Sequence, residues 1–290
     1  MARGYGATVS LVLLGLGLAL AVIVLAVVLS RHQAPCGPQA FAHAAVAADS
    51  KVCSDIGRAI LQQQGSPVDA TIAALVCTSV VNPQSMGLGG GVIFTIYNVT
   101  TGKVEVINAR ETVPASHAPS LLDQCAQALP LGTGSQLTLQ DLAKFQPEVV
   151  DALEVPLGDY TLYSPPPPAG GAILSFILNV LRGFNFSTES MARPEGRVNV
   201  YHHLVETLKF AKGQRWRLGD PRSHPKLQNA SRDLLGETLA QLIRQQIDGR
   251  GDHQLSHYSL AEAWGHGTGT SHVSVLGEDG SAVAATSTIN

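Results

Sequence analysis

The segment around Thr270 holds the residues with the clearest chemical potential. It reads Gly-Thr-Gly-Thr-Ser-His over 267–272. If the peptide bond between Gly269 and Thr270 were cut, Thr270 would carry a free α-amine beside its own hydroxyl. An α-amine has a pKa of about 8, so its neutral fraction can take the hydroxyl proton and make the threonine oxygen a nucleophile. Glycine at 269 would permit the unusual backbone that self-cleavage needs. An ordinary glycine-rich loop is the alternative, and the local pattern alone favours it.

Two alternating stretches follow the threonine and predict a β-hairpin over 270–276 and 282–289, with a turn at 278–280. In the first stretch Ser271, Val273 and Val275 share one face. His272, Ser274 and Leu276 share the other face. A chain that stops at an apolar strand after this hairpin is expected to be cut short.

Helical and strand patterns precede this hairpin and predict an α+β fold, with helices covering antiparallel sheet. Ser66 and Asp69 form a capping box before a helix that is apolar nearly all round and is therefore expected to be buried. The glycines of 87–91 indicate tight backbone packing rather than a phosphate loop, because no strand precedes them and no Lys-Ser/Thr follows. We expect helices over 42–48, 53–64, 68–81, 137–144, 172–181, 198–212 and 234–247, and strands over 92–97, 104–109 and 160–164.

The composition argues against two classes of site. The chain has 290 residues, a formal net charge of −3 and no basic block, so a nucleic-acid partner is not expected. Cysteine and histidine do not occur at zinc-ligand spacing, so we expect no metal. The histidines towards the end of the chain are expected on the surface or in loops: His253, His257, His266 and His272.

The N-terminal region contains a long uncharged run. Residues 8–29 are apolar and long enough to cross the hydrocarbon core of a bilayer as a helix. A cleaved signal peptide is the alternative, but its apolar core is shorter, and 30–32 is a poor cleavage site. We therefore expect a cytoplasmic tail over 1–7, a signal anchor over 8–29 and a stalk over 30–41.

Glycosylation sequons indicate the orientation of this anchor. Asn98, Asn185 and Asn229 each begin an Asn-X-Ser/Thr triplet, and all lie after the anchor. They favour a lumenal or extracellular body, which is a type II topology. The four cysteines, Cys36, Cys53, Cys77 and Cys125, agree with an oxidising compartment and allow three pairings, although buried free thiols are the alternative.

Several segments together resemble the gamma-glutamyltransferase (glutathione hydrolase) family. The resemblance covers most of the chain after the anchor and keeps the order of the family's motifs. It implies an N-terminal-nucleophile hydrolase sandwich, with 42–269 belonging to the large subunit and 270–290 to the start of the small subunit. The matching segments are 83–91 (Pro-Gln-Ser-Met-Gly-Leu-Gly-Gly-Gly), 107–112, 165–171, 206–210, 218–221, 270–275, 278–283 and 285–290.

The resemblance also implies residue roles. Thr270 would be the nucleophile, freed by autocleavage after Gly269, and Thr288 would orient it. Arg110 would bind the α-carboxylate of the glutamyl group, and Asn290 would contact its amino group. Cys53 and Cys77 would form the family's disulfide.

The implied reaction is acyl transfer. Thr270 would attack the γ-glutamyl amide of glutathione or of a conjugate such as leukotriene C4, and water or an amino acid would then take the glutamyl group. No cofactor is required. The implied setting is the plasma membrane, with an extracellular catalytic region, an anchor in lipid and the small subunit of the same precursor as partner.

The sequence departs from the family in two places. A long helical segment of the large subunit is skipped after Gly134, and the family continues beyond residue 290 with further substrate-binding and oxyanion-stabilising residues. Because one lost oxyanion donor slows a reaction about a hundredfold or more, the resemblance implies that this chain alone is inactive. The alternative function is that of a non-catalytic, membrane-anchored glycoprotein.

Overall fold

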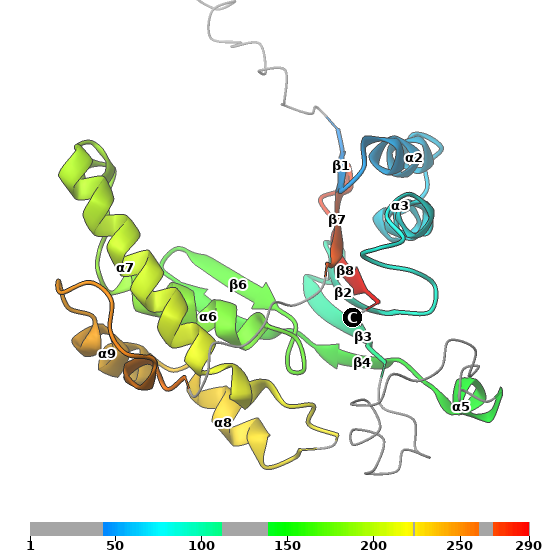
Figure 1. Ribbon diagram of the computed structural model, residues 1–290. Helices are drawn as coiled ribbons and strands as arrows, with labels where there is room; N and C mark the ends of the chain where they lie inside the picture. The colour runs from blue at the N-terminus through cyan, green and yellow to red at the C-terminus, as the bar shows by residue number, and fades with distance from the viewer. Residues whose placement is uncertain (1–42, 112–138, 223, 261–268, 290) are drawn as a thin grey trace, which may run out of the picture. The chain divides into compact units, whose positions relative to one another are not determined.

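The computed structural model describes residues 43–111, 139–222, 224–260 and 269–289 (Figure 1). The predicted tail, anchor and stalk lie outside these ranges, as do Asn290, Cys36 and Cys125. Within the described ranges, no helix has the length and apolar character needed to cross a membrane. The anchor over 8–29 therefore stays a prediction.

A six-stranded antiparallel sheet organises the first and last parts of the described chain. The hairpin expected around Thr270 is confirmed and lies inside this sheet (Figure 1). In the order of pairing, the strands are β1 (Ala45–Ala48), β7 (Ser271–Leu276), β8 (Ala282–Thr288), β2 (Gly91–Asn98), β3 (Lys103–Ala109) and β4 (Glu148–Asp151).

The helix expected over 42–48 is wrong. Ala45–Ala48 is strand β1, which pairs with β7 so that Val46 lies opposite Val275. Alanine has the highest helix propensity, but propensity differences are below about 1 kcal/mol per residue, and tertiary context overrides them. Here the context is the edge of β7, together with the core into which Val46 and Ala48 pack.

Two helices cover one face of the sheet. α2 (Lys51–Gln62) and α3 (Pro67–Val81) pack on each other and on β1 and β7. The expected capping box is confirmed, because the Ser66 hydroxyl accepts the Asp69 amide and the Asp69 carboxylate accepts the Ser66 amide. The core beneath the helices contains Ala70, Ala74, Leu75, Met86, Val273, Val275 and Ala285.

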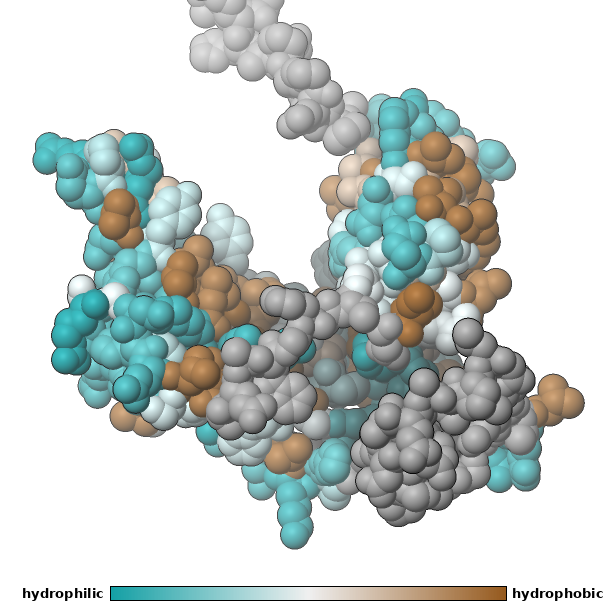
Figure 2. Space-filling view, viewed as in Figure 1, coloured by the Kyte–Doolittle hydropathy of each residue, from teal (hydrophilic) through white to brown (hydrophobic). Residues whose placement is uncertain are grey.

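The expectation that α3 is buried all round is wrong. One face meets the sheet, but Ile72, Val76 and Val80 on the opposite face are 48%, 51% and 76% exposed. Val52 and Ile56 of α2 are exposed as well. Figure 2 shows apolar side chains gathered over these two helices. Apolar composition therefore does not show that a helix is buried on every side. The outer face of α3 leaves apolar area in contact with water.

A disulfide joins the two helices, between Cys53 and Cys77, as the family resemblance implies. The two residues are 24 positions apart and their Cα atoms are 5.3 Å apart. The double substitution Cys53→Ser with Cys77→Ser should lower the free energy of unfolding by about 3 kcal/mol, because the open chain regains loop entropy. Urea unfolding of the oxidised parent and the variant measures this. Equal midpoints would contradict the bridge.

A second core lies among the later helices. It is formed by α6 (Gly171–Arg182), α7 (Pro194–Gly213) and α9 (Glu237–Gln246), with the hairpin of β5 (Leu153–Leu157) and β6 (Tyr160–Ser164) against α6. The expected helix over 234–247 is shorter than predicted, because Gly236 caps α9 and α8 (Leu227–Asp233) ends just before it. The remaining short elements are α5 (Leu139–Lys144), η1 (Glu189–Met191), η2 (Arg215–Leu218) and η3 (Leu255–Tyr258).

Candidate functional site

Four neighbouring strands begin or end at the end of the sheet where Thr270 lies. β7 begins at Ser271, which lies opposite Ser287 near the end of β8. Thr288, the last residue of β8, lies opposite Gly91 at the start of β2. Val92 lies opposite Ala109, which ends β3. The sheet therefore places Thr270, Thr288 and Arg110 at the same end of its strands, although Arg110 is far from the other two in sequence.

The Thr288 side chain lies at the bond predicted to be cut. Its hydroxyl Oγ1 donates to the carbonyl oxygen of Gly269 at 3.2 Å. Thr288 is 7% exposed, whereas Thr270 is exposed. The resemblance implies that Thr288 orients the nucleophile, and the structure adds a bond to the carbonyl whose carbon such a nucleophile would attack. A hydroxyl in this position can withdraw electron density from that carbonyl.

The glycine-rich segment lets the backbone at the start of β2 approach Thr288 and Glu111 closely. A Cβ at Gly90 would lie 2.0 Å from the carbonyl oxygen of Thr288, and a Cβ at Gly91 would lie 1.8 Å from Glu111 Oε2. Neither distance is possible for a real side chain. Tight backbone packing is therefore confirmed at Gly90. At Gly91 the nearest atom is the end of the flexible Glu111 side chain, and a Cβ at Gly89 would meet nothing within 4 Å.

Arg110 follows the end of β3 and is half-buried. Its backbone N–H donates to Asn108 Oδ1 at 3.1 Å, and its guanidinium lies 3.9 Å from the Glu111 carboxylate. Asn108 itself is 6% exposed. The amide of Asn108 thus fixes the backbone from which the predicted carboxylate-binding arginine extends.

A chain of polar contacts continues from Asn108. Its side-chain amide donates to Glu148 Oε2 at 3.1 Å, and Glu148 lies 3.8 Å from Arg222. Arg222 in turn donates to both carboxylate oxygens of Asp220 and holds the pKa of that carboxyl below its usual range. These contacts link the 218–221 motif to the strand end beside Arg110. Sequence reasoning missed Glu148 and Arg222, because nothing local pairs them.

The three sequon asparagines are exposed, as glycosylation requires. Asn98 ends β2, Asn185 follows α6 and Asn229 lies in α8. Glycosylation itself stays a prediction. Asn290, the expected contact for the substrate amino group, lies outside the described residues.

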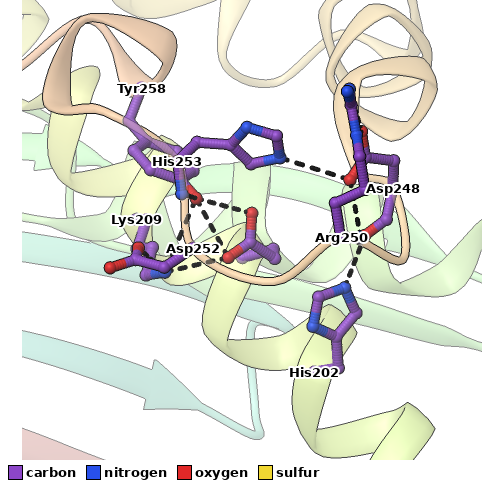
Figure 3. A network of polar contacts seen from close by, with 8 residues as sticks. His202, Lys209, Asp248, Arg250, Asp252, His253 and Tyr258 are labelled. Carbon is purple, nitrogen blue, oxygen red and sulfur yellow. Dashed lines mark hydrogen bonds and ion pairs between the residues drawn. The ribbon is translucent and has the colours of Figure 1, made fainter.

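A second polar cluster lies between α7 and the segment 248–258 (Figure 3). Glu206, 2% exposed, accepts the Tyr258 hydroxyl at 2.8 Å and Lys209 Nζ at 2.9 Å. Lys209 also donates to Asp252 at 2.6 Å. Every charge in this group has an opposite or hydrogen-bonding neighbour, which is the arrangement that a buried carboxylate needs for stability. The cluster fastens η3 to α7 and is structural.

Two of the histidines expected on the surface or in loops lie near this cluster, and both are partly buried. His253 lies in a loop, as expected, whereas His257 lies in η3. His253 stacks on His257 with ring centroids 4.1 Å apart, and its Nε2 lies 3.2 Å from Asp248. His272 is exposed on β7, as expected, and His266 lies outside the described residues. Among the described residues, no group of histidine, cysteine and acidic side chains could hold a metal ion.

We expect the Tyr258 hydroxyl to make the free energy of unfolding depend on pH in the alkaline range. Burial, and then Glu206, raises the pKa of this phenol, so its contribution to stability is present below about pH 10 and is lost as the pH rises through the folded pKa. Tyr258→Phe should cost about 1–3 kcal/mol at neutral pH, because Glu206 loses a buried donor. The difference in unfolding free energy between parent and variant should shrink above about pH 10. A pH-independent difference would contradict the assignment.

The sequence matches one known protein family. The gamma-glutamyltranspeptidase family model matches residues 53–133 and 125–290. The chain belongs to the gamma-glutamyltranspeptidase family. The match comes in two parts that meet near the position where the resemblance implies a skipped segment.

A human member of the family, glutathione hydrolase 5 proenzyme, is 71% identical over 408 aligned positions, covering 100% of this chain and 70% of the relative. The 408 positions exceed the 290 residues of the chain, so at least 118 aligned positions have no residue here. Identity at 71% of 408 positions amounts to about 290 positions. The differences therefore lie almost entirely in residues that the relative has and this chain lacks.

Solved structures agree with the family at the level of the fold. A cephalosporin acylase from Bacillus halodurans matches with a TM-score of 0.65 and 16% identity, over 88% of this chain and 68% of that one. A gamma-glutamyltranspeptidase from Helicobacter pylori matches with a TM-score of 0.61 and 14% identity, over 75% and 95%. This likeness supports the predicted N-terminal-nucleophile hydrolase fold.

Proposed function

We propose that the site at Thr270 performs γ-glutamyl acyl transfer on glutathione and its conjugates, with Thr270 as nucleophile after self-cleavage at Gly269. The observation that carries this proposal is the hydrogen bond from Thr288 to the Gly269 carbonyl. That bond singles out the peptide group between Gly269 and Thr270, just before β7, and the family to which the chain belongs contains hydrolases and transferases.

Self-cleavage would begin with attack by the Thr270 hydroxyl oxygen on the Gly269 carbonyl carbon. The peptide C–N bond breaks, an ester forms at Thr270, and the hydroxyl proton passes to the departing amine. Water then hydrolyses the ester, which leaves a carboxylate on Gly269 and a free α-amine on Thr270. During the attack, negative charge develops on the oxygen that already accepts the Thr288 hydroxyl, which stabilises it.

In the acyl-transfer reaction the freed Thr270 would attack a γ-glutamyl amide. Arg110 would bind the α-carboxylate, because a planar guanidinium gives a directional, charge-assisted pair. Asn108 would keep the Arg110 backbone in place. Water would release glutamate, or an amino acid would accept the glutamyl group. A donor such as leukotriene C4 belongs to this proposal.

We also propose that this site faces an oxidising, extracellular space, with residues 8–29 in the plasma membrane. The Cys53–Cys77 bridge and the exposed sequon asparagines support this placement.

A second candidate is a non-catalytic glycoprotein. It is favoured by the aligned positions of the human relative that have no counterpart here, which support the loss of a segment after Gly134. The exposed apolar face of α3 is what a chain without a covering segment would display.

Glutamate release separates the two candidates. The chain and its Thr270→Ala variant would be incubated with glutathione, and free glutamate would be measured. Acyl transfer predicts release that disappears in the variant. Equal signals from the two proteins would assign the chain to the non-catalytic candidate.

A further inference from the structure

A cavity of about 320 Å³ lies against strands β2, β3 and β4 of the six-stranded sheet. This volume is at the small end of the range for ligand sites, roughly 300–1,000 Å³. Proline lacks a backbone N–H, so the proline rings add apolar surface to the wall without adding a donor. The apolar part of the lining comprises Ile93, Val106, Val150, Pro166, Pro167 and Pro221.

The cavity and the proposed cleavage junction share one face of the sheet. The residues on either side of Ile93 pack into the core beneath α2 and α3, so the Ile93 side chain points to the other face. Ile93 lies opposite Thr286, and Thr288, two residues further along β8, projects from the same face as Thr286. Diagonal neighbours of this kind have Cα atoms about 7–8 Å apart, so the cavity begins close to the hydroxyl that bonds to Gly269.

The polar side chains at the rim of the cavity bond to one another. Asn108 donates to Glu148 at 3.1 Å, and Arg222 donates to both carboxylate oxygens of Asp220. These contacts satisfy the rim without a polar group from a ligand. The carboxylates of Glu148 and Asp220 both lie within 4 Å of the Arg222 guanidinium, so this group carries one more negative than positive charge. An anionic ligand is therefore disfavoured.

We propose that this cavity is a specificity subsite, which takes an uncharged apolar substituent on the sulfur of a glutathione conjugate. This inference rests on the proposed γ-glutamyl transfer and identifies the conjugates that the site favours. In glutathione, the sulfur belongs to the residue that follows the scissile γ-glutamyl amide. With that amide held at Thr270, a substituent on the sulfur can reach Ile93, because about two extended residues span the 7–8 Å from Thr288.

Calorimetric titration of the full chain with S-hexylglutathione and S-methylglutathione tests the subsite. The two probes carry the same γ-glutamyl group and differ only in the length of the alkyl group on sulfur. Each fully buried methylene strengthens binding about fourfold, so S-hexylglutathione should bind about tenfold or more tightly than S-methylglutathione. Equal dissociation constants, or no binding of either probe, would overturn the proposal.

A filled cavity should remove this preference. Val150→Phe places a ring in the cavity, so the two probes should then bind within about twofold of each other, with the affinity for S-methylglutathione nearly unchanged. Val149→Phe is the matched control, because the Val149 side chain points to the other face of β4 and is 64% exposed. A preference that survives Val150→Phe, or that is lost equally in Val149→Phe, would contradict the assignment.

Glutamate release from the same samples separates this inference from the proposed function. A chain that binds S-hexylglutathione with the expected preference, yet releases no glutamate from either probe, would overturn the proposed function and leave the subsite in place. A chain that releases glutamate from both probes with equal kcat/KM and binds them equally would overturn the subsite alone.

Discussion

Thr270→Ala is expected to leave a single uncut polypeptide under conditions in which the unaltered chain separates at 269/270. The substitution removes the only atom that the proposed mechanism uses to attack the Gly269 carbonyl. Thr270 is exposed and precedes β7, so the fold should be retained. Denaturing electrophoresis over a time course measures the fraction cut, with circular dichroism to check the fold.

Thr270→Ser is the matched control, because it keeps a hydroxyl at the same position. Cleavage should persist in this variant at a reduced rate. Cleavage of the Thr270→Ala chain at the same peptide bond would contradict the role of the threonine oxygen and would point to an outside protease.

Thr288→Val should slow cleavage by about a hundredfold or more. The valine keeps the shape of threonine but removes the donor to the Gly269 carbonyl, and one lost donor to a developing oxyanion has an effect of this size. The rate of appearance of the Thr270 α-amine measures it. Periodate oxidises an N-terminal threonine selectively to an aldehyde, which an aminooxy probe then labels.

Two variants control this experiment. Thr288→Ser retains the donor and should cleave at close to the parent rate. Ser287→Ala removes the neighbouring hydroxyl, which donates to the Gly91 carbonyl and not to Gly269, and it should affect stability more than cleavage. Equal rates for Thr288→Val and the parent would show that the observed hydrogen bond has no part in the reaction.

The sequence predicted those elements that local patterns determine. Ser66 and Asp69 are three residues apart, so their capping box is visible in the sequence. The hairpin of β7 and β8 was predictable because its strands alternate and a short turn joins them. The burial of Ser271, Val273 and Val275 on one face follows from the same period of two.

Long-range contacts account for what the sequence did not predict. Ala45–Ala48 becomes a strand because β7, more than 200 residues later, supplies its hydrogen-bonding partner. Glu148 reaches Asn108 from 40 residues away. The exposed side of α3 was mispredicted because apolar composition shows only that a helix can be buried, not that a partner covers each face.

The intact mass of the chain, expressed in a secretory cell line and deglycosylated, tests the central claim most directly. Self-cleavage predicts two products, one ending at Gly269 and one beginning at Thr270, with no residues lost between them. A single mass for the uncut chain would contradict it, because Thr270 would then never acquire the free α-amine that makes it a nucleophile.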